Sequence, residues 1–213
     1  MRTCLVSGLG ALALVLGAAS ARAEDQPPLV PTRDVAVTYH VQDPQGAMRV
    51  VHMDFDAADQ RVHIDMTDRP GFMVIDHKAG QVTLVNPTSK NYMQVPAPPA
   101  MGNLMFRSPD LHFTRKSTSK VAGISCTVWV LAAGNGAGGD ACITADGVVL
   151  SGRPANSTDP ATGIEAVSVV YGPQPASLFA PPAGFQRIQP GPPPGAPGAP
   201  ALGTPAPGAP AKP

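Results

Sequence analysis

Apolar and polar residues alternate one by one along much of the chain between positions 33 and 188. In residues 35–41, for example, Val35, Val37, Tyr39 and Val41 alternate with small or polar side chains. Successive side chains of a β-strand point to opposite faces, so this pattern predicts a strand that is buried on one face. Similar stretches predict further strands over residues 50–55, 61–66, 72–75, 82–85, 91–95, 112–118, 126–131, 141–144, 148–150 and 164–171.

The connections between these stretches are short and rich in turn residues. Asp146-Gly147 is a strong hairpin signal, and residues 43–46, 56–59 and 77–80 also read as turns. Parallel neighbours need crossovers of about a dozen residues, so the strands are expected to be antiparallel. The only helical pattern covers residues 101–106. The sequence therefore predicts a mainly β fold: a curved antiparallel sheet or incomplete β-barrel of about ten strands with one short helical segment.

The two ends of the chain differ from this central domain. Residues 1–23 contain an early arginine, an apolar run and small residues at 21 and 23, which is typical of a secretory signal peptide. Residues 24–32 are expected to be a lead-in segment, and 33–188 the antiparallel β domain. Ten of the last 24 residues are proline, and most others are glycine or alanine. Residues 189–213 are therefore predicted to be a disordered tail.

Export would place the protein in the periplasm or outside the cell, where Cys126 and Cys142 are expected to form a disulfide. A free redox pair is the alternative, but the sequence has no Cys-x-x-Cys spacing there. Cleavage after residue 23 leaves a net charge of −2, which argues against nucleic acid as a partner. No long apolar segment follows the signal, so the cleaved protein is not expected to span a membrane.

Three segments carry a resemblance to a known group of proteins. They contain Gly123, Cys126 and Trp129, then Ala141, Cys142, Asp146, Gly147 and Leu150, then Tyr171, Ser177, Phe179, Pro182 and Gly184. The chain resembles uncharacterised bacterial exported proteins that are similar in layout to the LolA/LolB-like lipoprotein-carrier superfamily. The resemblance implies an unclosed antiparallel barrel with helices plugging its open side. This chain has less helical pattern than such carriers, so a thin or absent plug is expected.

Methionine is frequent at the apolar strand positions and in the helical segment. Methionine tolerates repacking, which suits a surface that binds varied apolar ligands such as lipids. The alternative is an ordinary core in which methionine fills gaps. The candidate ligand-binding residues are Met53, Phe55, Met66, Met73, Met93, Met101, Leu104 and Met105.

Three histidines form a second candidate site. A turn at residues 56–59 would place His52 opposite His63 and Asp54 opposite Arg61, with His40 diagonal to His52 on the same face. Imidazoles at that spacing could bind Zn²⁺ or Cu²⁺. The alternative is a plain Asp54–Arg61 ion pair beside ordinary surface histidines.

The sequence contains none of the common motifs for nucleophilic, metal-dependent or nucleotide-dependent catalysis. We therefore expect a non-enzymatic protein without a catalytic site or cofactor. The leading hypothesis is an exported protein that binds an apolar small molecule or lipid on its methionine-lined face. The alternatives are a structural module that docks onto an envelope protein partner through its sheet edge, and a weak Zn²⁺- or Cu²⁺-binding protein.

Overall fold

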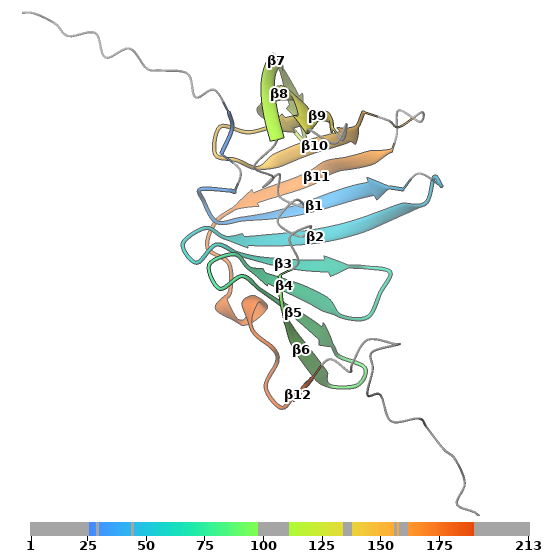
Figure 1. Ribbon diagram of the computed structural model, residues 1–213, viewed down its shortest axis with the longest axis vertical. Helices are drawn as coiled ribbons and strands as arrows, with labels where there is room; N and C mark the ends of the chain where they lie inside the picture. The colour runs from blue at the N-terminus through green and yellow to red at the C-terminus, as the bar shows by residue number, and fades with distance from the viewer. Residues whose placement is uncertain are drawn as a thin grey trace, which may run out of the picture.

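The computed structural model describes residues 26–28, 30–43, 45–97, 111–133, 138–155, 157 and 162–189. These residues form one curved, open sheet, as Figure 1 shows, so the predicted fold class is confirmed. The described strands are β1 (Val35–Gln42), β2 (Met48–Asp56), β3 (Arg61–Met66), β4 (Phe72–Asp76), β5 (Gln81–Asn86), β6 (Asn91–Pro96), β7 (Leu111–Val121), β8 (Ile124–Ala133), β9 (Gly138–Ile143), β10 (Val149–Pro154), β11 (Gly163–Tyr171) and β12 (Gln186–Ile188).

The strand order is β12-β6-β5-β4-β3-β2-β1-β11-β10-β9-β8-β7. Two meanders, β1–β6 and β7–β11, meet where β1 pairs with β11. All neighbours are antiparallel except β12, which lies parallel to β6. The helical segment predicted at residues 101–106 lies outside the described residues. Within the described ranges, the helical element is a 3-10 turn, η2 (Ala176–Phe179).

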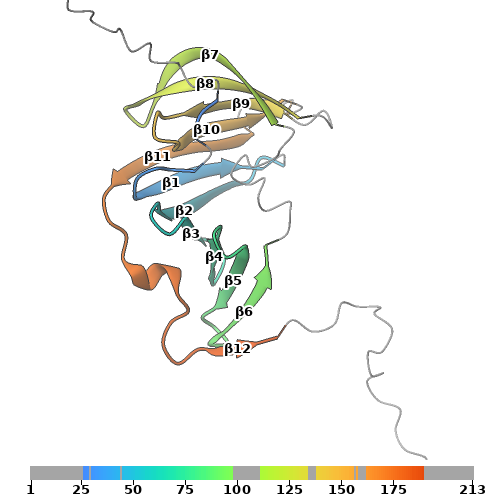
Figure 2. The ribbon, with the colours of Figure 1, turned by 60° about the vertical axis from the view of Figure 1, so that its left-hand side comes forward.

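The sheet curves at the β7–β11 end. Register shifts interrupt the β1–β11, β9–β10 and β7–β8 ladders, and such bulges increase the local twist. Figure 2 shows β7 and β8 arching over that end of the sheet. The sulfur atoms of Cys126 in β8 and Cys142 in β9 lie 2.06 Å apart, at disulfide distance. The expected cysteine pair therefore links two neighbouring strands of the curved end.

Three hairpins of the first meander, β2–β3, β4–β5 and β5–β6, use the same four-residue turn. The closing pairs are Asp56 with Arg61, Asp76 with Gln81, and Asn86 with Asn91. The side-chain oxygen of the first residue accepts a hydrogen bond from a backbone N–H inside each turn. The last turn residue has a left-handed backbone: φ is 53° at Gln60, 61° at Gly80 and 49° at Lys90. This local chemistry sets the register of the meander.

The turn between β2 and β3 corrects the predicted register. It occupies residues 57–60, not 56–59, so Asp56 faces Arg61. The distance from Arg61 Nη2 to Asp56 Oδ2 is 2.6 Å. Burial raises the pKa of the Asp56 carboxyl, but hydrogen bonds from the Asp59 N–H and the Arg61 guanidinium outweigh it and hold the pKa below its usual range. The Asp54–Arg61 pair predicted from the sequence is therefore wrong.

A segment after β11 returns along the first meander and ends as β12. Gly172 donates its N–H to the Asp34 carbonyl, and Gln186 donates to the Lys90 carbonyl. Between them, η2 packs against β3. There the Arg61 guanidinium lies 5.0 Å from the centre of the buried Phe179 ring. This return strap, residues 172–188, follows the ends of the strands in Figure 2 and adds β12 to the far edge of the sheet.

The lead-in segment packs on the β9–β10 hairpin. Pro27 and Pro31 are buried, and Thr32 donates its N–H to the Asp146 carbonyl at 2.9 Å. Gly147 follows with φ of 89°, and a Cβ there would lie 2.7 Å from the Val30 carbonyl oxygen. The hairpin glycine is therefore needed both for its backbone angle and for the close approach of the lead-in.

Candidate functional site

An unbroken row of apolar side chains crosses one face of the sheet. The strand register places its members directly opposite one another from β2 to β6 and on to β12. We call this the methionine row: Met53, Ile64, Met73, Leu84, Met93 and Ile188. Phe55 and Met66 lie on the same face in flanking positions. The structure thus brings five of the predicted ligand-binding residues onto one face.

The row is buried at one end and open at the other. Ile64 is buried, and Met53 and Met73 pack against the main core. In contrast, 39% of Leu84 and 38% of Ile188 is exposed. A hollow of about 390 Å³ lies at this open end, lined in part by Leu84, Met93 and Ile188. The exposed end of the row is therefore accessible to an apolar ligand.

Sequence reasoning identified this site only in part. The predicted residues Met101, Leu104 and Met105 lie outside the described residues. Leu84 lies two residues after Val82 in a predicted strand, so the two side chains share a face. The sequence therefore predicts the position of Leu84, but the candidate ligand-binding residues are mainly methionines. Ile188 could not, because its place depends on the parallel pairing of β12 with β6.

The histidines do not assemble as predicted. His52 faces Asp65, and its Nδ1 lies 3.0 Å from the Thr38 hydroxyl. His63 faces Asp54, with 3.2 Å between His63 Nδ1 and Asp54 Oδ2. The His63 ring is buried and lies 4.7 Å from the Phe72 ring. The predicted His52–His63 pairing is therefore wrong.

The shifted turn explains this outcome. The observed turn moves β3 by two residues along β2, so each β3 side chain stays on its predicted face of the sheet but lies opposite a different β2 residue. His40 is exposed and faces Val50 in β2 and Glu165 in β11. Over the described ranges, no group of three or more His, Cys, Asp or Glu side chains is placed to hold a metal ion.

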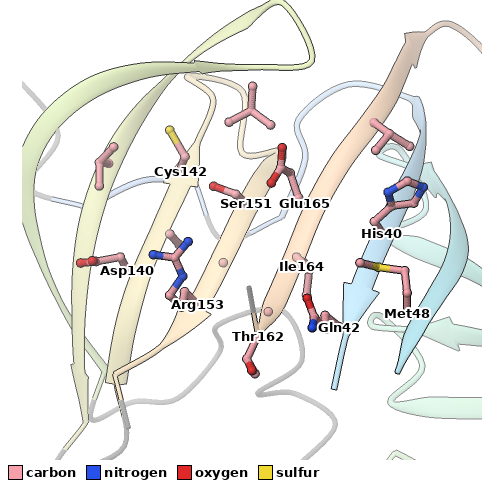
Figure 3. Close-up of a pocket in the computed structure, with 16 residues that line it drawn as sticks. His40, Gln42, Met48, Asp140, Cys142, Ser151, Arg153, Thr162, Ile164 and Glu165 are labelled. Atoms are coloured by element: carbon pink, nitrogen blue, oxygen red, sulfur yellow. The ribbon is translucent and has the colours of Figure 1, made fainter. Parts of the chain in front are cut away.

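A second hollow lies on the other face of the sheet, where β1, β2 and β11 meet β8–β10. This polar groove has a volume of about 490 Å³, and Figure 3 shows its side chains. His40 and Gln42 enter it from β1, opposite in direction to the core residues Tyr39 and Val41. Gly163 faces Gln42 and contributes no side chain, which leaves the space between them open.

The described part of the chain contains no helix long and apolar enough to cross a membrane.

Comparisons with known proteins support the fold and name no family. No family model matches the sequence, and no curated protein matches it. Among solved structures, the chain is similar to an uncharacterised conserved protein from Thermus thermophilus. Their TM-score is 0.52 at 12% identity, over 74% of this chain and 91% of that one. Identity this low indicates a shared fold and nothing about activity.

Two structures containing MucB are also similar, at lower scores. One is MucB itself, with a TM-score of 0.48 and 14% identity over 71% of this chain and 58% of that one. The other is the Pseudomonas aeruginosa MucA/MucB complex, with a TM-score of 0.46 and 13% identity over 70% of this chain and 56% of that one. This chain thus spans a little over half of each MucB chain. Similarity at this level carries no argument about function.

Proposed function

We propose that this protein is a non-enzymatic, exported protein that binds an apolar ligand, such as the acyl chain of a lipid, along the methionine row. The observation that carries the proposal is the exposed end of the row at Leu84 and Ile188. From Leu84 the row continues inward through three half-buried or buried side chains, Met73, Ile64 and Met53. An acyl chain lying along Leu84, Met93 and Ile188 would cover apolar surface that water now contacts.

The expected affinity follows from the size of the hollow. A volume of about 390 Å³ lies at the lower end of the range for small-ligand sites, roughly 300–1,000 Å³. Each buried methylene contributes about 0.8 kcal/mol. Six methylenes would therefore contribute about 5 kcal/mol before the loss of ligand freedom is counted. Micromolar or weaker binding is expected, and the unbranched methionines would adjust to chains of different shape.

The cysteine pair supports the proposed location. Disulfides persist in the periplasm and outside cells but are reduced in most cytosols, and Cys126 and Cys142 lie at disulfide distance. We therefore propose export to the periplasm or the medium, directed by residues 1–23. Mass spectrometry of protein recovered from the native host, with free thiols alkylated before lysis, tests this. Reduced Cys126 and Cys142 would contradict it.

The alternative of docking to an envelope partner through a sheet edge has less support. β7 is the edge strand at one end of the sheet, and most of its residues are exposed. The exposed stretch includes Arg115, Lys116 and Lys120. Charged edge strands discourage pairing with a second chain.

The ligand is tested with the fluorescent fatty acid cis-parinaric acid and the full-length mature chain. Saturable binding is expected, and Leu84→Ser should weaken it at least five-fold because a hydroxyl then stands at the open end of the row. The matched control is Val170→Ser, since Val170 is 61% exposed but faces Ala36, away from the row. The control should change affinity less than two-fold. An equal loss in both variants, or no saturable binding, would refute the proposal.

A further inference from the structure

Polar side chains from three strands and one adjoining loop converge on the polar groove. His40 comes from β1, Glu165 from β11, Ser151 and Arg153 from β10, and Thr162 precedes β11. Ser151 faces Glu165, and Glu165 faces His40, so these three form a row across neighbouring strands. Figure 3 shows these five side chains around the groove. Such convergence is a common feature of ligand sites.

Thr162 carries a polar atom that the protein does not satisfy. Its side chain is only 6% exposed, and Oγ1 makes no hydrogen bond in the structure. A buried hydroxyl without a partner is costly, and most buried polar groups are paired. Thr162 lines the groove, but its Oγ1 is closed to solvent, so a ligand seated there supplies the missing partner once the side chain rotates about χ1 towards the groove.

Arg153 and Glu165 offer opposite charges that do not neutralise each other. Glu165 faces Ser151, two residues before Arg153 on β10, so the two charged residues are diagonal neighbours. Diagonal Cβ atoms are about 7–8 Å apart, within reach of long side chains. Even so, neither side chain takes part in an ion pair within the described ranges. Asp140 lies opposite Arg153 on β9, but it pairs with Lys116, whose Nζ is 3.8 Å from Asp140 Oδ2.

Apolar side chains complete the groove. Met48 is 57% exposed and Val167 is 45% exposed, and both line it. Val167 is the extra residue of the bulge between β1 and β11. The groove thus presents two carboxylates, Asp140 and Glu165, of which Asp140 is paired with Lys116. It also presents the Arg153 guanidinium, buried and half-buried hydroxyls, and exposed apolar side chains within the same space.

We propose that the polar groove binds a small zwitterion that carries an ammonium group, a carboxylate and an apolar side chain. An amino acid and a short peptide both have this chemistry. Glu165 accepts hydrogen bonds from the ammonium group, and the Arg153 guanidinium binds the carboxylate in its two-pronged geometry. The Thr162 hydroxyl forms a hydrogen bond with the ligand. Met48 and Val167 pack against the apolar side chain of the ligand. The site lies on the opposite face from the methionine row and does not depend on it.

Ligand titrations followed by NMR of the full-length mature chain test the charge requirement. The probes are glycyl-L-leucine and free L-leucine, which carry both charges, N-acetyl-L-leucine and L-leucinamide, which carry one each, and N-acetyl-L-leucinamide, which carries none. A zwitterion should bind at least ten-fold more tightly than each singly charged probe. Comparing L-leucine with glycyl-L-leucine decides between an amino acid and a peptide. Equal binding of all five probes, or no binding, would overturn the proposal.

Variants test the assigned roles. Arg153→Gln and Glu165→Gln should each weaken zwitterion binding at least ten-fold, whereas Arg69→Gln and Asp65→Asn, which lie outside the groove, should change it less than two-fold.

Thr162→Val should raise the melting temperature while weakening binding several-fold, because it removes an unsatisfied hydroxyl that the ligand uses. A fall in melting temperature with unchanged affinity would show that Thr162 is only structural. None of these variants should alter cis-parinaric acid binding.

Discussion

Tyr39 connects the two meanders through its phenol group. Its hydroxyl donates a hydrogen bond of 2.8 Å to the Val149 carbonyl in β10, across the intervening strand β11. Burial raises the pKa of the Tyr39 phenol well above its usual value, and Tyr171 adds to the shift. The pKa of Tyr171 is raised by burial and then by the nearby Asp146 carboxylate. Both phenols are therefore held in the neutral form by the fold.

This arrangement predicts a loss of stability at high pH. The phenol of the unfolded chain has its ordinary pKa of 10.0, whereas the folded phenol ionises at a higher pH. Stability is therefore fully present below pH 10 and falls as pH rises through the folded pKa, by up to about 1.4 kcal/mol per pH unit for the buried Tyr39.

Tyr39→Phe separates the hydrogen bond from the titration. At pH 8 it should lower the free energy of unfolding by about 1 kcal/mol through the lost hydrogen bond. Between pH 10 and 11 it should lose less stability than wild type. Urea unfolding at pH 8, 10 and 11 measures both effects. Parallel pH curves for the two proteins would contradict the assigned role of Tyr39.

Individual site residues could be predicted where alternation alone places them. Met53 and Met66 share the predicted face because each lies at the apolar phase of an alternating strand. Met73 lies in the unbroken apolar run of residues 72–75, so only the pairing of β3 with β4 assigns its face. Thr162 and Arg153 could not be assigned to a groove, because their proximity depends on the pairing of β10 with β11 and on the bulges in that region.

At the scale of elements, the turns decide what the apolar pattern cannot. Sliding β3 by two residues along β2 keeps every apolar side chain on its face, so both the predicted and the observed registers satisfy the pattern. The observed one forms because Asp56 accepts the Asp59 N–H, and Gln60 adopts a left-handed backbone. A glutamine at that position gives no sequence signal for the left-handed backbone, unlike Gly80 in the β4–β5 hairpin.

The repeated turn makes a testable pair of substitutions. Gly80 and Lys90 have the same role, with φ of 61° and 49°, and a Cβ at Gly80 would contact nothing within 4 Å. The stability difference between glycine and another residue at position 80 therefore comes from backbone strain alone. Gly80→Ala should lower the free energy of unfolding by about 1 kcal/mol, and Lys90→Gly should raise it by up to about 1 kcal/mol. Urea titrations measure both, and changes of the same sign would contradict the turn assignment.

At the scale of the whole molecule, the return strap joins segments that the sequence pattern leaves separate. Residues 172–185 have no period-two alternation, so neither their course nor the parallel β12 could be predicted. The open, curved sheet was predictable because short connections require antiparallel neighbours. The strand order was not, since β1 and β11 are far apart in sequence.

Phe179 anchors the strap, and its removal tests this role. Phe179→Ala should lower the free energy of unfolding by about 3 kcal/mol, because a buried aromatic ring is lost. Backbone amides of β12 should also exchange faster with solvent, since β12 is held to the sheet through the strap. Ser177→Ala, an exposed residue of the same turn, is the control. Unchanged exchange in β12 of the Phe179 variant would show that β12 is held without the strap.

The central claim is that an acyl chain lies along the methionine row. The direct measurement is NMR of the full-length mature chain, with labelled methyl groups of Met, Ile, Leu and Val, in the presence of spin-labelled stearic acid. We expect the strongest line broadening at Leu84, Met93 and Ile188, with Met48 and Val170 unaffected. Strongest broadening at Met48 or Val170, or no broadening at any methyl group, would contradict the claim.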